Sequence, residues 1–397
     1  MTSPGEGTEA GLRRARLAAA AAFATQGLVF ISLTTRLPDF SDHWDLSEAE
    51  LSGLLLMMVL LAGVGSVVAE TLAARRDSAT LLRSGLALIA VGVPTMALAP
   101  GLVAFVAGMA VYGVALGIVD ASTNMQAVAL EHRYGRPILP SFHGAWTLGG
   151  IVGSAITLAT AHLPLATAAG VVVVPLLALT QPFLPRVGDP VEPGLQLDVP
   201  WRPIIVVGVA MVLFYMVDTA AFTWGPTYLD HVFSTPSSLV ALATFPYLLA
   251  SGAMRLAGDT VVDRFGPVAV LRVGGLVACG GLAVVVFAPN WPVAVVGFLV
   301  MGAGVAVIAP LSFSAAARIA GDTPDLDPHL RHARVDAVIG RFNQFNYVGA
   351  LFGAVLTGLV GSGNLRIGFA VPMVLVLGIL PLARAFGAGR GNSLRQL

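Results

Sequence analysis

The sequence is poor in charge, has a single cysteine and contains no lysine. Charged residues make up 11% of its 397 residues and hydrophobic residues 56%, whereas a soluble domain carries about 25% charged residues. Such a chain has too few polar side chains to cover its surface in water, so we expect lipid to be its solvent. The lone Cys279 excludes a disulfide framework and a cysteine-based metal site.

Other absences disfavour further classes of protein. The Gly-x-x-x-x-Gly-Lys-Ser/Thr loop that cradles nucleotide phosphates needs a lysine, and a formal net charge of zero gives no indication of nucleic acid as a partner. The His-Glu-x-x-His and Gly-x-Ser-x-Gly motifs are also missing, so a membrane-embedded enzyme is the weaker hypothesis. We therefore expect no catalytic residues, no metal and no cofactor.

The sequence does contain twelve apolar stretches of the length of a membrane-spanning helix. Crossing about 30 Å of hydrocarbon takes roughly 20 helical residues, and the short alternating segments of a membrane barrel are absent. Pro310 lies inside the tenth stretch and predicts a kink there. The stretches lie near residues 17–35, 51–73, 81–99, 102–129, 142–161, 165–184, 204–228, 238–256, 268–288, 292–317, 342–361 and 367–386.

Arginine is distributed unevenly between the two ends of these stretches. Twenty of the 22 arginines fall on the side of the N-terminus, and only Arg36 and Arg366 fall on the other side. Because basic residues concentrate in cytoplasmic loops, both termini are predicted to be cytoplasmic. A basic set made of arginine alone is typical of GC-rich bacterial genomes, so we expect a multi-pass protein of the bacterial cytoplasmic (inner) membrane.

The second half of the chain repeats the first. At an offset of 189, Arg75, Arg83 and Pro100 align with Arg264, Arg272 and Pro289. At an offset of 188, Arg14 and Pro38 align with Arg202 and Pro226. At an offset of 200, Phe142, Gly149 and Gly153 align with Phe342, Gly349 and Gly353. The alternative is chance similarity between apolar helices. Six helices return the chain to the same side, so the repeats are parallel, with a solute site expected between the halves near the midplane.

This organisation predicts an all-α membrane protein with twelve transmembrane helices in two parallel-repeat six-helix bundles. The expected segments are a cytoplasmic tail (1–16), an N-terminal bundle (17–184), a cytoplasmic central loop (185–203), a C-terminal bundle (204–386) and a second cytoplasmic tail (387–397).

Together these features resemble the major facilitator superfamily, whose helix 2–3 loop carries the pattern Gly-x-Leu-Ala-Asp-Arg-x-Gly. The first copy, at residues 70–77, keeps Leu72, Ala73 and Arg75 but loses the Asp and both Gly; the second, ending at Gly266, keeps its Asp-Arg-x-Gly end. The resemblance implies a cytoplasmic latch between the halves. The candidate gating residues are Arg75, Asp263, Arg264 and Gly266.

Within that superfamily, the fourth and fifth stretches look most like the fucose-permease-like group. Residues 117–124 and 142–150 carry the resemblance, and Asp120 and Asn124 match an acid followed four positions later by Asn. The resemblance implies that Asp120 serves proton coupling. The fifth stretch lacks the Gly-Pro pair of drug antiporters, which counts mildly against drug export.

Polar residues inside the stretches are the remaining candidates, because an ionisable group in a spanning helix costs about 2.5–3.5 kcal/mol or more. An interhelical hydrogen bond is the alternative role for Asp120, a helix-end contact for His143, hydration for Asp218 and an interfacial anchor for Trp224. The candidate proton-coupling residues are Asp120 and His143. The candidate substrate-binding residues are Asn124, Trp146, Asp218, Trp224, Asn343, Gln344 and Asn346.

These observations favour secondary active transport of a small polar organic solute, sugar-like or a metabolite, by a proton-coupled monomer in the lipid bilayer. Acid, imidazole, amide and indole groups suit such a solute. Proton-antiport export of a drug or secondary metabolite uses the same parts and stays open. A receptor that binds without transporting is the third hypothesis, although the stretches between helices are too short for an appended soluble domain.

Overall fold

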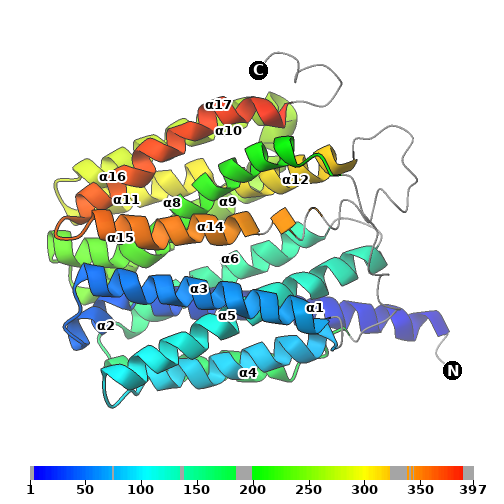
Figure 1. Ribbon diagram of the computed structural model, residues 1–397, viewed down its shortest axis with the longest axis horizontal. Helices are drawn as coiled ribbons and strands as arrows, with labels where there is room; N and C mark the ends of the chain where they lie inside the picture. The colour runs from blue at the N-terminus through cyan, green and yellow to red at the C-terminus, as the bar shows by residue number, and fades with distance from the viewer. Residues whose placement is uncertain are drawn as a thin grey trace. The chain divides into compact units, whose positions relative to one another are not determined.

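A computed structural model describes residues 4–73, 76–134, 138–184, 199–321, 338, 341–342 and 344–387 (Figure 1). The chain is all-α over these ranges and divides into two compact units. The first unit contains α1 (Pro4–Thr34), α2 (Leu37–His43), α3 (Glu48–Ala73), α4 (Ser78–Ala97), α5 (Leu102–Tyr134), α6 (Leu139–Thr160), η1 (Leu165–Val172) and α7 (Val173–Leu179), together with residues Pro236–Ala241.

The second unit begins with α8 (Trp201–Phe233) and continues past the short helix η2 (Ser237–Ala243). It contains α9 (Phe245–Phe265), α10 (Pro267–Phe287), α11 (Trp291–Val305), α12 (Ile308–Gly321), α14 (Gln344–Leu351), the π-helical turn η3 (Phe352–Leu356), α15 (Thr357–Val360), α16 (Leu365–Leu375), η4 (Val376–Gly378), α17 (Ile379–Leu382) and η5 (Ala383–Phe386).

The predicted fold class is confirmed: the protein is an all-α membrane protein with twelve membrane-spanning helices. In the described ranges, nine helices are long and apolar enough to cross a membrane, and α6 and the apolar segments Leu165–Leu179 and Gln344–Val360 coincide with the other three predicted stretches. Several helices extend beyond their apolar stretch: α1 begins at Pro4, α5 ends at Tyr134 and α9 ends at Phe265. The domain boundaries drawn from the sequence stay a prediction.

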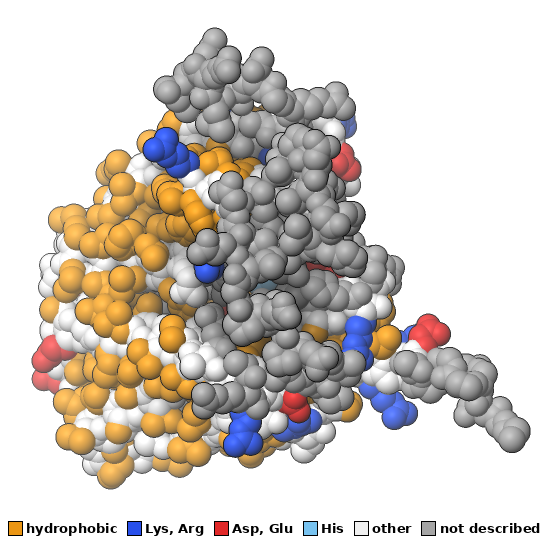
Figure 2. Space-filling view, turned by 45° about the vertical axis from the view of Figure 1, so that its right-hand side comes forward, with side chains coloured by type: hydrophobic (Ala, Val, Ile, Leu, Met, Phe, Trp, Pro, Cys, Tyr) orange, Lys and Arg blue, Asp and Glu red, His pale blue; other side chains and the backbone are white. Residues whose placement is uncertain are grey.

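Large hydrophobic side chains lie on the outside as well as in the core. Val103 is 85% exposed and Leu256 is 89% exposed, and Figure 2 shows a broad face dominated by hydrophobic side chains, with charged groups near its edges. Soluble proteins rarely expose apolar patches beyond a few hundred Å². Such a surface suits contact with lipid tails.

Equivalent close contacts of glycine in the two units confirm the repeat. A Cβ on Gly149 would strike the carbonyl oxygen of Ala24, and one on Gly349 would strike that of Val212. The two glycines are 200 positions apart and the two carbonyls 188, which are the offsets found in the sequence. Small residues let helix backbones approach closely in lipid, so the α1–α6 and α8–α14 pairs have the same packing.

The two arginines that break the charge bias each bind carbonyl groups at a helix end. Arg36 is buried and donates from Nη2 to the carbonyl of Thr160 at 3.1 Å, at the end of α6. Arg366 donates from Nη1 to the carbonyls of Val286 and Ala288, both at 2.8 Å, at the end of α10. The last carbonyls of a helix lack intrahelical partners, so both arginines have a structural role that explains their position.

The tenth predicted stretch is broken, as Pro310 predicts. α11 ends at Val305 and α12 begins at Ile308, leaving a two-residue turn between them. Proline has no N–H to donate to the carbonyl four residues earlier, which here belongs to Ala306. Arg255 of α9 donates from Nε to that carbonyl at 3.3 Å.

Candidate functional site

Asp120 is paired with an amide on another helix of unit 1. It is half-buried on α5, and the Nε2 of Gln26 on α1 donates to its Oδ1 at 3.3 Å. Gln26 is 6% exposed, and its Oε1 has no hydrogen-bond partner among the described residues. The Asn124 amide donates to the Asp120 backbone carbonyl at 2.9 Å, so it binds its own helix.

One face of α1 gathers the other candidates of this unit. Phe23, Gln26 and Phe30 are spaced by three and four residues and therefore lie on one side of the helix. The His143 ring lies 5.5 Å from Phe23, edge to face, and the Trp146 ring lies 6.4 Å from Phe30. The structure thus brings Asp120, His143 and Trp146 to the same face of α1.

Gln26 was missed by sequence reasoning, and Glu131 turns out to have a structural contact. Gln26 is an amide in an apolar stretch, a signal that could have marked it, but its partner lies 94 positions away. Glu131, on the same helical face as Asp120 by spacing, accepts the backbone N–H of Ile138 at 2.7 Å. That bond gives a partner to the N–H of the residue that precedes α6.

In unit 2, Asp218 and Trp224 both point into the protein. Asp218 is 8% exposed and accepts a hydrogen bond of 2.5 Å from the Tyr247 hydroxyl on α9. Trp224 is fully buried and donates from Nε1 to the carbonyl of Ala354 at 2.7 Å. Trp224 is thus packed inside the protein, and its predicted role in solute binding stays a prediction.

The remaining predicted binding residues lie at the start of α14. Gln344 is exposed and Asn346 is half-buried. Asn343 lies outside the described residues. Their role in solute binding stays a prediction.

The gating candidates of the second repeat lie at the end of α9. Asp263 and Arg264 are exposed, and the Arg264 guanidinium lies 5.3 Å from the centre of the Phe265 ring. Gly266 has a φ of 76° and closes the helix through its N–H to the Val262 carbonyl at 2.8 Å. Glycine reaches this conformation at no steric cost, so its identity follows from the turn. Arg75 lies outside the described residues.

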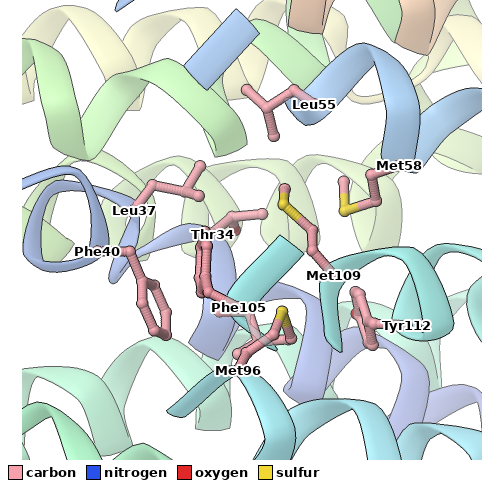
Figure 3. A pocket seen from close by; sticks show the side chains of 10 residues that line it. Thr34, Leu37, Phe40, Leu55, Met58, Met96, Phe105, Met109 and Tyr112 are labelled. Atoms are coloured by element: carbon pink, nitrogen blue, oxygen red, sulfur yellow. The ribbon is translucent and has the colours of Figure 1, made fainter. Parts of the chain in front are cut away.

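Unit 1 also holds an apolar pocket that is separate from the polar pairs. Figure 3 shows Met58, Met96 and Met109 around it, with the Tyr112 ring beside them. The hydroxyl of Tyr112 is buried and has no hydrogen-bond partner in the described ranges. Nearly all of its lining is apolar, so a polar solute is unsuited to it. The pocket is lined by Leu33, Thr34, Leu37, Phe40, Leu55, Met58, Met96, Phe105, Met109 and Tyr112.

Twelve apolar helices in two repeated units, each with a carboxyl group inside a spanning helix, define a multi-pass membrane transporter. The Major Facilitator Superfamily model matches residues 207–390. This match covers just under half of the chain and indicates the major facilitator superfamily.

Two relatives support this assignment. An uncharacterised transporter of Sinorhizobium fredii is 28% identical over 75% of this chain and 81% of its own length. An uncharacterised MFS-type transporter of Yersinia pestis is 26% identical over 92% of this chain and 94% of its own. Both names state transport and neither states a solute.

Solved structures share the fold at low identity. A point mutant of the nucleoside transporter NupG superposes with a TM-score of 0.71 at 15% identity, over 95% of this chain and 99% of that one. FucP in the outward conformation gives 0.61 at 16% identity, over 93% and 97%. A variant of FucP, named as the Escherichia coli fucose:proton symporter, gives 0.58 at 14%, over 93% and 97%. These likenesses show the fold.

Proposed function

We propose that this transporter couples the movement of protons to the uptake of a small polar organic solute by alternating access. It acts as a monomer in the bacterial cytoplasmic membrane with both termini in the cytoplasm. The proposal draws on the acid in α5, the arginine bias of the sequence and the fold shared with a fucose:proton symporter. Proton-antiport export remains the alternative direction.

The observation that carries the proposal is the bond between Gln26 and Asp120. An amide offers donors through Nε2 and acceptor sites through Oε1. Gln26 donates to the carboxyl oxygen as the pair stands, and its Oε1 has no partner among the described residues. By rotating, the same side chain can accept from a protonated Asp120. A buried polar group then keeps a partner in both protonation states, which lowers the cost of moving the proton.

The solute class follows from the groups around the same face of α1. His143 and Asn124 offer polar groups, while Trp146 beside Phe30 offers an aromatic surface. Sites for small organic molecules combine an apolar wall with a few polar groups, which suits a solute with both hydroxyl groups and an apolar face. The nucleoside and fucose named for the two structural neighbours are of this kind.

The coupling test compares Asp120→Asn with Asp45→Asn, which removes an exposed carboxyl outside the pair and outside the gating candidates. A thermal-shift screen against sugars, polyols, nucleosides and organic acids first supplies a labelled solute. In proteoliposomes, Asp120→Asn is expected to abolish accumulation driven by a pH gradient while solute exchange continues. Asp45→Asn should keep accumulation. Undiminished proton-driven accumulation by Asp120→Asn would remove Asp120 from the mechanism.

The orientation is tested separately by reporter fusions. A reporter fused after Leu397 and one inserted near His43 should report opposite sides of the membrane, with Leu397 inside. Signals from the same side would overturn the orientation while leaving the coupling proposal to its own test.

A further inference from the structure

Unit 2 contains a second carboxyl group whose surroundings differ from those of Asp120. Asp218 lies on α8, almost without exposure, and accepts the Tyr247 hydroxyl at 2.5 Å. Hydroxyl-to-carboxylate bonds of 2.5–2.7 Å are typical of an ionised acceptor. The geometry is that of a buried carboxylate held by a neutral donor.

Arg255 supplies the charge that this carboxylate needs. It follows Tyr247 by eight residues on α9, so both lie on one face of that helix, and its positive charge interacts with Asp218. Its Nε also donates to the carbonyl of Ala306, the one that Pro310 leaves without a helical partner. Arg255 therefore connects the carboxylate of α8 with the break between α11 and α12.

The fold does not require this network. In the repeat, Asp218, Tyr247 and Arg255 correspond to Phe30, Met58 and Ser66 of unit 1, at offsets of 188, 189 and 189.

The helix that carries Tyr247 and Arg255 packs on its neighbour as its counterpart in unit 1 does. A Cβ on Gly113 of α5 would meet the carbonyl oxygen of Met58 on α3 at 2.8 Å, and one on Gly302 of α11 would meet that of Tyr247 on α9 at 2.5 Å. Since α3 packs on α5 with Met58 and Ser66 at these positions, the packing of α9 on α11 does not require Tyr247 and Arg255, and the cost of burying ionisable groups there serves another purpose.

We propose that Asp218 is a second proton-binding site, controlled by the distance of Arg255, so that the transporter has one titrating carboxyl group in each unit. The inference rests on the proposed proton-coupled transport and adds to its site. While Arg255 is near, Asp218 stays ionised and Tyr247 donates to it. When Arg255 moves away, an unpaired buried charge is strongly disfavoured, so Asp218 takes up a proton from water instead.

Few other groups can compete for this role. The described elements packed on α8 carry further ionisable side chains, but Arg318 donates to the carbonyl of Phe386 and Arg366 to those of Val286 and Ala288. The charged or titratable groups that act on Asp218 are Arg255 and Tyr247. The remaining described ionisable side chains on elements in contact with α8 are Tyr347 on α14, Arg384 on η5, and Asp263 and Arg264 at the exposed end of α9.

Infrared difference spectroscopy on purified protein in lipid nanodiscs tests the proposal without any solute. Acidification should produce carboxyl bands from buried groups, and Asp218→Asn should remove one that Asp120→Asn leaves in place. Asp263→Asn is the control for an exposed acid. A spectrum of Asp218→Asn equal to wild type would show that Asp218 keeps its charge and would overturn the proposal. If Asp218→Asn lost a band while the spectrum of Asp120→Asn equalled that of wild type, the result would count against the proposed function and leave the inference about Asp218 standing.

Two further variants keep the proposal testable if Asp218→Asn does not fold. Arg255→Gln removes the counter-charge, so the Asp218 band should persist to a pH about one to three units higher than in wild type. Tyr247→Phe removes a neutral donor and should shift the band in the same direction by less. Arg255→Lys, which restores the charge, should return the band towards the wild-type pH. A band that stays in place in Arg255→Gln would overturn the control by Arg255.

Discussion

The two units share their backbone packing and differ in their polar groups. Gly92 approaches the carbonyl of Gly108 as Gly281 approaches that of Gly297, at the same offset of 189. Yet the acid–amide pair of unit 1 joins α1 to α5, while the acid–tyrosine pair of unit 2 joins α8 to α9. At the positions of Gln26 and Asp120, unit 2 has Phe214 and Ala309, both buried. Packing is therefore a property of the repeat, and ionisable groups are particular to each unit.

The same contrast separates the arginines into two sets. Arg83 and Arg272 correspond in the repeat, and each binds a carbonyl near the end of the last helix of its unit: Arg83 that of Leu179 at 3.3 Å and Arg272 that of Leu380 at 3.4 Å. Arg255 corresponds to Ser66 and has no such counterpart. Among these three arginines, the repeated pair binds helix ends, and Arg255 is particular to unit 2.

The largest effect is expected where the repeat brings backbones together. Gly149→Leu and Gly349→Leu each place a side chain against a carbonyl oxygen, and overpacking that cannot relax costs about 1–3 kcal/mol or more. Both variants should lose most folded protein, and to a similar extent. Gly144→Leu is the control, since a Cβ there meets nothing within 4 Å. Fluorescence-detected size-exclusion chromatography gives the folded fraction; a large difference between the two variants would break the symmetry.

The next effect comes from copying the acid of unit 1 into unit 2. Ala309→Asp buries a carboxyl without an amide partner and should lower stability by about 2.5–3.5 kcal/mol. Adding Phe214→Gln supplies the partner at the register position of Gln26 and should recover about 1 kcal/mol of it. Thermal unfolding of the single and double variants measures the recovery. Phe214→Leu in place of Phe214→Gln is the control, and equal recovery by both would show that the pairing does not transfer.

The helix-end arginines should have an intermediate effect. Arg366→Ala leaves the carbonyls of Val286 and Ala288 without their donor and removes the stacking of the guanidinium on Phe233, 5.0 Å from the ring centre. A loss of about 1–3 kcal/mol in unfolding free energy is expected. Arg264→Ala is the matched control, because Arg264 is exposed at the end of α9. An equal loss in both variants would contradict the structural role of Arg366.

The sequence predicts the fold well because the fold depends on local hydropathy and on a repeated register. Twelve apolar stretches and the offsets of 188, 189 and 200 are visible in the chain without knowledge of contacts. Once the contact of Gly149 with the Ala24 carbonyl is known, the offsets of 200 and 188 predict that of Gly349 with the Val212 carbonyl.

The site was predicted less well, because pairing and burial depend on distant residues. Asp120 was identifiable as a costly charge in a helix, but its amide partner Gln26 lies on another helix. A tryptophan at position 224 looks the same in the sequence whether its side chain faces a vestibule or the core. Its Nε1 donates to the carbonyl of Ala354, 130 positions away, and a contact so distant in the chain cannot be read from local sequence. Helical periodicity fixes which residues share a face of one helix, and leaves open which neighbour covers that face.

The smallest effect concerns Asp39 in α2, outside the spanning helices. Arg36 lies 3.3 Å from its carboxylate, yet burial raises the pKa of Asp39 above its ordinary value of 3.8 because the lost hydration outweighs the attraction of Arg36. An acid with a raised pKa in the folded state stabilises the fold below its unfolded pKa, and that contribution is lost as the pH rises through the folded pKa. Asp39→Asn should therefore be as stable as wild type or slightly more stable at pH 7, by less than about 1 kcal/mol in unfolding free energy, with the difference vanishing near pH 4. Thermal unfolding at the two pH values measures it. Arg36→Ala should be less stable at both pH values, because Arg36 also binds the end of α6. A loss at pH 7 in Asp39→Asn as large as that in Arg36→Ala would mean that the ion pair, rather than the helix-end contact, is what Arg36 contributes to unit 1.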